Sequence, residues 1–325
     1  MESGKNNKMV TDYKKIICLT PVFNDWESFS ILTNEIYESF KDQYFNIEII
    51  AINDGSIDDF EINNNYNQLI EVVNLNTNIG HQRAIAVGLH YINDVKKNFD
   101  FVIVLDADGE DKPQDIVSLI KKCIELNSSK IVFAQRKKRE ESLLFKTGYF
   151  FYKFLFYLMT NQKINFGNFS CIPGKLLKRV VVQDNLWNHY SGSIIQAKTP
   201  YDKVILNRGI RYAGHSKMNF TSLVLHGLSS VSVYFDFLSV RILKISSFGV
   251  GLCLLSVISI LYLKLFTESS IPGWASNLIL IIFTIILQLS SVTLIVLLMQ
   301  LSTRKNIKST NLYIYKDFIE NINQI

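Results

Sequence analysis

The sequence contains only four cysteines, Cys18, Cys123, Cys171 and Cys253, and no two of them form a CxxC pair. A disulfide framework and a cysteine-based zinc site are therefore not indicated, and a reducing compartment is expected. An excess of one charge sign is also absent, because 34 Lys and Arg residues stand against 29 Asp and Glu residues for a net charge of +5. This balance gives no indication of a nucleic-acid partner.

A secretory signal is missing as well. The N-terminal segment MESGKNNKMVTDYKK is polar and contains no apolar core, so we expect the first domain to remain in the compartment where it is made. The chain has 325 residues, 48% of them hydrophobic. This is sufficient for one large domain or two small ones with a substantial core.

Two long apolar runs lie near the C-terminus, at residues 245–266 and 278–301. The first is interrupted only by Lys264, and the second contains no charge. Each run is long enough to cross a hydrocarbon layer of about 30 Å as a helix. The alternative is a pair of buried core helices in a soluble protein, but uncharged runs of this length favour two transmembrane helices.

The charges that flank these runs predict their orientation. Two precede the first run and three follow the second: Arg241, Lys244, Arg304, Lys305 and Lys308. The connecting loop carries almost no positive charge once Lys264 extends toward the interface. Because Lys and Arg concentrate on the cytoplasmic side of membrane proteins, both outer ends of the pair are expected to face the cytoplasm.

Short apolar strands alternate with amphipathic helices ahead of these runs. The expected strands lie at residues 15–23, 47–54, 71–76, 101–108 and 130–135. The expected helices lie at residues 26–40, 81–92 and 113–126. Strands that are apolar throughout are typical of a sheet covered by helices on both faces. The predicted fold class is therefore α/β.

Polar residues collect where the first four expected strands end. They are Thr20, Asn24 and Asp25, then residues 53–56, residues 76–80 and residues 106–108. Ligands of open α/β sheets bind in the crevice at the carboxyl ends of the strands, so one crevice would contain all four clusters. Any one cluster is also explained by turn chemistry, since Asn-Asp-Gly-Ser is a favourable turn sequence.

The fourth strand ends in carboxylates, in the stretch FVIVLDADGEDKPQDI at residues 101–116. Asp106 and Asp108 leave the strand together, and two hard carboxylates at this spacing suit Mg²⁺ or Mn²⁺ that substrate phosphates also hold. No His or Cys stands beside them in the sequence, which disfavours zinc. Asp111 and Asp115 flank Pro113, and we expect both to serve the start of the helix there, where negative charge is favourable.

Six segments, in this order and followed by the two apolar runs, resemble the family 2 glycosyltransferases: TPVFND, AINDGSIDD, NIGHQRAIAVG, VLDADGEDKPQDI, AQRKKRE and RYAGHSK. The similarity is greatest to the branch that contains the dolichyl-phosphate mannose synthases and the bacterial polyprenyl-phosphate glycosyltransferases. It covers nearly the whole chain. The resemblance implies a nucleotide-diphospho-sugar transferase (GT-A) fold with a C-terminal pair of transmembrane helices.

The resemblance also implies a site for a nucleoside diphosphate sugar. The segments that match the family's nucleotide-binding loops supply the candidates Pro21, Asn24, Asp54, Gly80 and Arg83. Asn53 stands where many relatives have a further Asp, and this leaves the choice of base open.

The family's DxD motif corresponds to Asp106 and Asp108, which are expected to be catalytic by holding the divalent cation, with Glu110 as a further metal or sugar contact. Such a cation neutralises the charge that develops on the departing nucleoside diphosphate. Many relatives have an acidic residue in the segment that matches residues 164–171, where this chain has Asn165 and Asn168.

The asparagines of this segment bear on the acceptor. A hydroxyl acceptor needs a base to take its proton, whereas a lipid phosphate is already ionised, so Asn168 is expected to position a polyprenyl phosphate. The alternative is a base elsewhere, for instance Asp184.

An anionic acceptor requires cationic partners, and residues 136–139 and 208–217 supply them. Matching residues of the enzymes that this chain resembles contact phosphate groups, which implies acceptor-phosphate binding by Arg136, Arg139, Arg211, Ser216 and Lys217. Guanidinium groups pair two phosphate oxygens at a time. For Lys137 and Lys138, a solvated face or a contact with anionic lipid is an equal alternative.

The expected organisation is a cytoplasmic catalytic domain at residues 1–220, a juxtamembrane amphipathic helix at 221–244, the two spans, and a cytoplasmic tail at 302–325. Within the catalytic domain, residues 142–160 are rich in Tyr and Phe and contain two lysines. This composition favours a helix that lies in the membrane interface. A buried core helix is the alternative.

The predicted function is transfer of a sugar from a nucleoside diphosphate to a polyprenyl phosphate of the undecaprenyl or dolichyl type, at the cytoplasmic face of the cell membrane. Such a hexosyltransferase would serve cell-envelope polysaccharide synthesis. Two alternatives stay open: transfer to a hydroxyl of a lipid-linked saccharide or glycerolipid, and a catalytically silent membrane scaffold. Homo-oligomerisation is also open, and the sequence does not indicate which sugar or which nucleotide is used.

Overall fold

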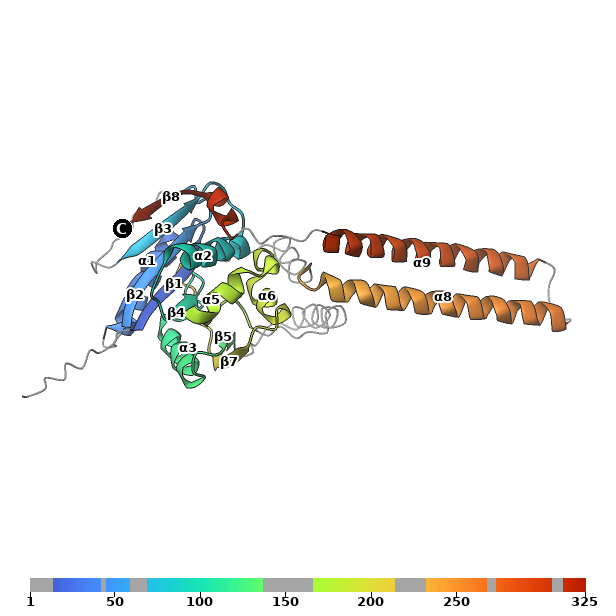
Figure 1. The fold of residues 1–325 in the computed structure, drawn as a ribbon, viewed down its shortest axis with the longest axis horizontal. Coiled ribbons are helices and arrows are strands. Elements are labelled where there is room, and N and C mark those ends of the chain that lie inside the picture. The colour runs from blue at the N-terminus through green and yellow to red at the C-terminus, as the bar shows by residue number, and fades with distance from the viewer. Residues whose placement is uncertain are drawn as a thin grey trace, which may run out of the picture. The chain divides into compact units, whose positions relative to one another are not determined.

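The computed structural model describes residues 14–41, 45–58, 69–136, 166–213, 232–267, 273–305 and 312–325. The chain divides into two compact units. The first contains Met1–Ser142, Ile164–Val233 and Thr310–Ile325, and the second contains Leu143–Lys163 and Tyr234–Ser309. The sheet belongs to the first unit and the two long helices to the second (Figure 1).

One mixed sheet of eight strands, in the order β7-β5-β6-β4-β1-β2-β3-β8, organises the first unit. The strands are β1 (Lys14–Val22), β2 (Phe45–Asn53), β3 (Ile70–Leu75), β4 (Phe101–Val104), β5 (Ile131–Arg136), β6 (Ser170–Pro173), β7 (Tyr201–Leu206) and β8 (Ile319–Gln324). Neighbours β1, β2, β3 and β4 are parallel. β6 is antiparallel to both β4 and β5, β7 is parallel to β5, and β8 is antiparallel to β3. Six strands therefore run in one direction, and only β6 and β8 run in the other.

Both faces of the sheet are buried, as its apolar strands predict. Successive residues of β1 alternate between the two faces: Ile16 and Cys18 join one core cluster, and Ile17 and Leu19 join the other. Helices α1 (Trp26–Phe40) and α3 (Pro113–Glu125) cover the first face, and α2 (His81–Val95), α5 (Gly174–Val181) and α6 (Tyr190–Gln196) cover the second (Figure 1). Strands buried on both faces have nearly continuous apolar sequences.

Helix α3 directly follows residues 105–112, the loop after β4 that we call the carboxylate loop. Pro113 occupies the first turn, where its missing N–H has no partner to lose. Asp115 adds negative charge to the same turn, which favours the helix dipole. Ile116, Leu119 and Cys123 are buried at helical spacing, so the helix packs one stripe against the sheet.

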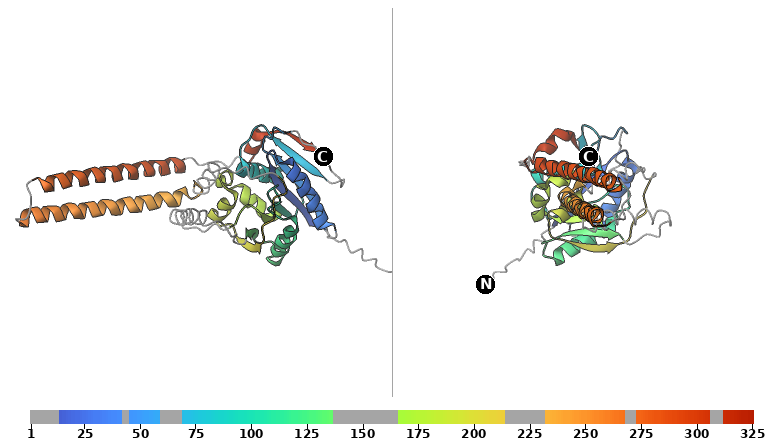
Figure 2. Two further views of the ribbon diagram at one scale, coloured as in Figure 1. Left: turned by 180° about the vertical axis from the view of Figure 1, so that it is seen from behind. Right: turned by 90° about the vertical axis from the view of Figure 1, so that its right-hand side faces the viewer.

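The C-terminal segment returns to the first unit and supplies an edge strand. A short 3₁₀ helix, η2 (Ile314–Phe318), precedes β8 and inserts Tyr315, which is 1% exposed. The hydroxyl of Tyr315 donates to Asp94 on α2 at 2.7 Å, and the ring of His90 stacks on the ring of Tyr315 at 6.1 Å between centroids. Residues expected as a cytoplasmic tail thus complete the sheet beside β3 (Figure 2).

The predicted α/β fold class is confirmed, and all five predicted strands and three predicted helices of the first unit are present. Three strands were not predicted. β6 has four residues, β7 is half-exposed along its length, and β8 has the polar sequence IENINQ. None of them shows the apolar run that identifies a buried strand.

The second unit contains two long helices that lie side by side in all views, α8 (Phe235–Phe266) and α9 (Trp274–Lys305) (Figures 1 and 2). Both are long and apolar enough to cross a membrane by length and composition. At one end of the pair, Gln300 donates a hydrogen bond to Asp236 at 2.7 Å. Each predicted span lies within one of these helices.

Only part of the helices expected to lie in the membrane interface falls within the residues that the structure describes. Residues 142–160 and 221–231 lie outside the described residues. Residues 235–244, expected to belong to a separate juxtamembrane helix, form the first turns of α8 and are continuous with the predicted span.

Candidate functional site

The sheet topology brings the predicted site residues to the edge of the sheet that is formed by the carboxyl ends of the parallel strands. The six parallel strands end there, and β6 and β8 begin there because they run in the opposite direction. Asn168, two residues before β6, therefore lies at the same edge as Asp106, two residues after β4.

Asp54 joins two loops at this edge. Its Oδ1 accepts a hydrogen bond from the N–H of Ile79 at 2.8 Å, and its Oδ2 accepts one from the N–H of Gly80 at 3.1 Å. Burial raises the pKa of this carboxyl, although the two amides favour the anion. Gly55 follows with φ +68°, and a Cβ there would lie 2.6 Å from the backbone nitrogen of Asn78. Only glycine allows the two loops to approach this closely.

Asn24 and Pro21 shape the same region from β1. Asn24 has φ +48°, a conformation that asparagine adopts more readily than most residues. Its Oδ1 accepts the N–H of Ile57 at 2.9 Å, and its own N–H donates to Ser56 Oγ at 2.9 Å. Pro21 is buried within β1, opposite Ile52 of β2. Asn24 thus supports the loop at residues 53–58, and Pro21 lies in the strand that leads to Asn24.

Gly80 and Arg83 stand where α2 begins. Gly80 has φ +90° and precedes the helix directly. Its carbonyl accepts the N–H of Arg83 at 2.9 Å, which closes the first turn. The side chain of Arg83 is exposed at this end of the helix.

Asp106 contacts Asp111 of the same loop and His81 of α2. Its N–H donates to Oδ2 of Asp111 at 3.1 Å, and its Oδ1 lies 3.2 Å from Nε2 of His81. Burial would raise the pKa of Asp106, but the nearby His81 and Arg136 outweigh burial and lower it. Burial likewise opposes the positive charge of His81, and Asp106 outweighs it and raises the pKa of the imidazole.

Asn168 takes part in a chain of contacts that ends at Asp106. Its Nδ2 lies 2.9 Å from Nε2 of His81, and its Oδ1 accepts a hydrogen bond from Nε2 of Gln82 at 3.2 Å. Oε1 of Gln82 in turn accepts the N–H of Tyr190 at 2.8 Å. This chain fixes how the amide of Asn168 is turned.

Sequence reasoning missed His81 and Gln82, although both lie in the NIGHQRA segment between the predicted Gly80 and Arg83. A signal was present. They are the first two residues of a helix that begins at the crevice edge, where side chains of the first turn lie beside the ends of the neighbouring strands.

Asp108 forms an ion pair with Arg211, with 2.6 Å between Oδ2 and Nη2. Its Oδ1 accepts the N–H of Glu110 at 3.0 Å. Burial and the negative charge of Asp106 raise the pKa of Asp108, and Arg211 opposes both effects. The repulsion that Asp106 exerts on ionised Asp108 is of the kind that a bound cation relieves.

Arg136, at the end of β5, pairs with two carboxylates. Its Nη2 lies 2.8 Å from Oδ1 of Asp111, and its Nη1 lies 3.4 Å from Oε2 of Glu110. Arg208 pairs with the same oxygen of Glu110. Burial would lower the pKa of Arg136, but Asp111 outweighs burial and raises it.

The expectation that Asp111 serves the start of α3 is wrong. Its side chain is 2% exposed, and its two oxygens accept from the N–H of Asp106 and from Arg136. Burial, together with the charge of Asp106, raises the pKa of Asp111 to about 7. Asp115 does lie in the first turn of α3, as predicted.

Residues 207–213, which we call the strap, cross the carboxylate loop after β4. The N–H of Gly209 donates to the carbonyl of Glu110 at 2.8 Å, and the N–H of Tyr212 donates to the carbonyl of Asp108 at 3.0 Å. Gly109 has φ +84°, and a Cβ there would lie 2.5 Å from the ring of Tyr212. The strap therefore packs directly on the loop that carries the DxD motif.

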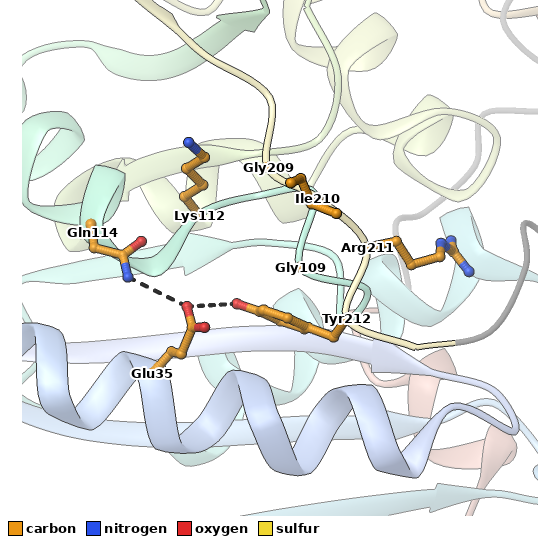
Figure 3. Close-up of a pocket in the computed structure, with 8 residues that line it drawn as sticks. All are labelled: Glu35, Gly109, Lys112, Gln114, Gly209, Ile210, Arg211 and Tyr212. Carbon is orange, nitrogen blue, oxygen red and sulfur yellow. Dashed lines mark hydrogen bonds between the residues drawn. The ribbon is translucent and has the colours of Figure 1, made fainter.

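Glu35 of α1 anchors the strap through Tyr212. The hydroxyl of Tyr212 donates to Oε2 of Glu35 at 2.8 Å, and Nε2 of Gln114 approaches the same oxygen at 3.4 Å (Figure 3). A pocket of about 460 Å³ lies here, lined by Glu35, Gly109, Lys112, Gln114 and residues 209–212. The guanidinium of Arg211 extends away from Glu35 and Gln114 (Figure 3).

The carboxylates of Asp106 and Asp108 offer the oxygen ligands that Mg²⁺ or Mn²⁺ prefers. Oδ1 of Asp106 is buried and, among the described side chains, meets no donor with hydrogen-bond geometry. The part of the chain that the structure describes contains no cluster of three or more His, Cys, Asp or Glu side chains that could hold a metal. Asp106 and Asp108 thus suit a cation that takes its other ligands from phosphates and water, as Mg²⁺ often does. Glu110 instead pairs with Arg136 and Arg208.

Three predicted acceptor-binding residues, Arg139, Ser216 and Lys217, lie outside the described residues. The proposed alternative base, Asp184, begins the 3₁₀ helix η1 (Asp184–Trp187). Within the described parts of the chain, no hydrogen bond or ion pair joins Asp184 to the carboxylate loop.

Comparison with protein families gives a match to the profile "Glycosyl transferase family 2" over residues 18–186. The chain belongs to this family. The match includes the second half of β1, β2 to β4, the carboxylate loop and Asn168, so the resemblance to this family is confirmed. The mixed α/β sheet agrees with the GT-A type of fold that the family resemblance implied.

Curated relatives of this family 2 glycosyltransferase include an uncharacterized glycosyltransferase, YkcC, of Bacillus subtilis, 27% identical over 81% of each chain. A prophage bactoprenol glucosyl transferase homolog of Escherichia coli is 30% identical over 68% of this chain and 73% of its own. An undecaprenyl-phosphate 4-deoxy-4-formamido-L-arabinose transferase of Photorhabdus laumondii is 28% identical over 65% of each chain. The solved structure of glucosyl-3-phosphoglycerate synthase from Mycobacterium tuberculosis with Mn²⁺, UDP and phosphoglyceric acid is 14% identical, with a TM-score of 0.49 over 69% of this chain and 78% of that one.

Proposed function

We propose that this family 2 glycosyltransferase moves a sugar from a nucleoside diphosphate sugar to a polyprenyl phosphate at the cytoplasmic face of a membrane. One observation carries the proposal. Two carboxylates, Asp106 and Asp108, and three guanidinium groups, Arg136, Arg208 and Arg211, meet at one edge of the sheet. This combination suits a reaction in which donor and acceptor both bring phosphate groups.

On the donor side, Asp106 and Asp108 would hold Mg²⁺ or Mn²⁺, which neutralises the charge on the departing diphosphate when bound. Arg211 forms an ion pair with Asp108, and Arg136 and Arg208 form ion pairs with Glu110. A cation at the aspartates would compete with Arg211 for Asp108. The guanidinium group would then be available for a phosphate oxygen.

The donor nucleoside is proposed to lie against the loop at residues 53–58 and the start of α2. Asp54 locks that loop to the N–H groups of Ile79 and Gly80. The exposed side chain of Arg83 stands at the same helix end.

On the acceptor side, the residue at the position where many relatives have an acid is Asn168, and its amide is held by Gln82 and lies beside His81. An amide cannot take a proton from a hydroxyl at neutral pH. A phosphate monoester needs no such base, because it is already ionised. The asparagine therefore favours a phosphate acceptor over a hydroxyl acceptor.

The names of two relatives support the lipid part of the proposal. They are a bactoprenol glucosyl transferase homolog and an undecaprenyl-phosphate sugar transferase. The two apolar helices, α8 and α9, are suited to keeping the enzyme at the membrane where such a lipid resides.

The C-terminal strand supports the orientation. β8 follows α9 in the chain, yet it pairs with β3 in the sheet formed before α8. If both helices cross the membrane, the chain must enter and leave on the same side. Arg and Lys residues flank both outer ends, which favours the cytoplasm. The interfacial helix at 142–160 and the phosphate contacts of Arg139, Ser216 and Lys217 stay part of this proposal.

The test compares wild-type protein with Asp108→Asn and a control, Glu125→Gln, whose carboxylate is 64% exposed on α3. Membranes would receive labelled sugar nucleotides, Mg²⁺ or Mn²⁺, and purified undecaprenyl phosphate. We expect labelled polyprenyl phosphate sugar from wild type and control, none from Asp108→Asn, and none from any protein after chelation.

Three results would contradict the proposal. Label that enters only lipids already carrying a sugar, or only glycerolipids, would assign a hydroxyl acceptor. Equal transfer by Asp108→Asn and wild type would remove the proposed metal site, and no transfer with any sugar nucleotide would favour a silent scaffold.

A further inference from the structure

Three asparagines lie in one row across β2, β3 and β8. The strand register pairs Asn53 with Asn74 and Asn74 with Asn321. Nδ2 of Asn74 donates to Oδ1 of Asn321 at 2.6 Å, and Nδ2 of Asn53 donates to Oδ1 of Asn74 at 2.8 Å. We call this row the asparagine relay. It connects the strand after the membrane helices to the loop at residues 53–58.

The relay has one allowed direction. Oδ1 of Asn53 accepts the backbone N–H of Ser56 at 2.9 Å. A backbone N–H can only donate, so the oxygen of Asn53 must face Ser56 and its NH₂ group must face Asn74. Because the NH₂ group of Asn53 donates to Oδ1 of Asn74, that oxygen faces β2 and the NH₂ group of Asn74 faces β8. This NH₂ group requires an acceptor on β8. Asn321 supplies that acceptor.

The relay ends in a loop with little freedom of its own. The N–H of Ser56 is bound by Asn53, and the hydroxyl of Ser56 accepts the N–H of Asn24. Between Asn53 and Ser56 lie Asp54, which holds the next loop, and Gly55, which packs against it. A change in how the amide of Asn53 is turned therefore reaches the whole loop.

The sequence of this chain fits the relay. A carboxylate at position 53 could accept from Ser56 but could not donate to the oxygen of Asn74. The amide of Asn53 does both. Asn53 thus belongs with Asn74 and Asn321 as a set.

We propose that Asn321 is a positioning residue for the donor: acting through Asn74 and Asn53, it holds the loop at residues 53–56 in the shape that receives the nucleoside. This rests on the proposed function, since donor binding at this loop is part of that proposal. The strand that follows the membrane helices is then part of the donor site without touching the ligand.

The chain offers a matched control. Asn323 lies two residues further along β8, on the same face of the strand, is exposed like Asn321, and stands opposite Val72. Asn321→Leu removes the acceptor of the relay, whereas Asn323→Leu makes the same chemical change without touching it. Asn321→Asp keeps an acceptor oxygen and is the conservative variant.

Steady-state kinetics of the full-length protein in membranes would be measured with varied sugar nucleotide. We expect Asn321→Leu to raise the donor KM about three- to tenfold, the range expected for one lost hydrogen bond, with kcat and the acceptor KM unchanged. Asn321→Asp and Asn323→Leu should retain the wild-type donor KM. Equal donor KM values for Asn321→Leu and Asn323→Leu, or a fall in kcat alone, would overturn the proposal.

Amide hydrogen exchange separates this inference from the proposed function, because it needs no ligand. The peptide covering residues 53–58 should exchange faster in Asn321→Leu than in Asn323→Leu. If wild type uses no sugar nucleotide, the proposed function fails and the donor role of the relay fails with it, even where exchange is faster. If wild type transfers sugar and exchange is the same in both variants, only the relay is refuted.

Discussion

The Arg136→Met variant is expected to be less stable than the wild type, and the difference in the free energy of unfolding should be larger at alkaline pH than at acidic pH. The cause is Asp111, whose side chain is 2% exposed and 2.8 Å from Nη2 of Arg136. Its pKa in the folded protein is raised from 3.8 to about 7. Between these values the folded state keeps a proton that the unfolded state has lost, so stability falls as pH rises from about 3.8 to about 7. Above pH 7 both states are ionised, and the fall ends.

Arg136 keeps the pKa of Asp111 from rising further. Without the guanidinium group, the carboxyl would hold its proton above pH 7, and the loss of stability would continue with pH. At pH 8, one unit above the wild-type pKa of about 7, ionisation of Asp111 stabilises the wild type by about 1.4 kcal/mol, and the variant lacks this contribution. At pH 6 the same contribution is close to zero. The variant's deficit should therefore be about 1.4 kcal/mol larger at pH 8, or roughly 3–6 °C in Tm for a domain of this size.

Thermal unfolding would be followed by tryptophan fluorescence in detergent with a chelator, so that no metal shares the carboxylates. Arg136→Lys is the control, because it keeps a positive charge near Asp111 and should keep most of the wild-type pH dependence. If Arg136→Met lowered the Tm equally at pH 6 and pH 8, Asp111 would not be the group that Arg136 keeps ionised.

Two further predictions concern stability. Asp54→Asn should lower the free energy of unfolding by about 1.5–3 kcal/mol, because one of the two charge-assisted hydrogen bonds to backbone amides is lost; Asp58→Asn, an exposed control in the same loop, should have no effect on Tm, and equal Tm values for the two variants would contradict this. Lys96→Met should cost about 3–5 kcal/mol in denaturant unfolding, because Lys96 lies 2.6 Å from Glu48 and 2.8 Å from Glu71, whose side chains are 10% and 6% exposed. An unchanged midpoint would mean that these carboxylates are solvated without the lysine.

Local patterns in the sequence predicted the centre of the fold. The apolar runs that become β1 to β5 are buried on both faces, and burial on both faces leaves a plain signal. β8 leaves none, since its residues are polar and it pairs with β3 through backbone hydrogen bonds. Its partner lies nearly 250 positions away, as the 247-residue separation of Asn74 and Asn321 shows. No periodicity within β8 can indicate such a partner.

The same division holds for the site. Asp106 and Asp108 could be identified from their spacing after a strand, and the strand does place them at the crevice edge. The partners of these carboxylates could not, because His81 and Arg211 reach them from α2 and from the strap. Asp111 shows why local rules mislead here. Two residues before Pro113 it looks like a helix-start residue, yet it is turned inward by an arginine 25 positions away.

The place of β8 in the sheet also has a consequence for how the protein is made. β8 comes after α8 and α9 in the chain, so a ribosome completes both apolar helices before it makes the strand that covers β3. Until then β3 has an open edge, and unpaired strand edges promote association with other chains. The strand that carries Asn321 is therefore the last part of the sheet to be made, and a chain that ends within α8 or α9 would have neither the covered edge of β3 nor the acceptor that Asn321 provides.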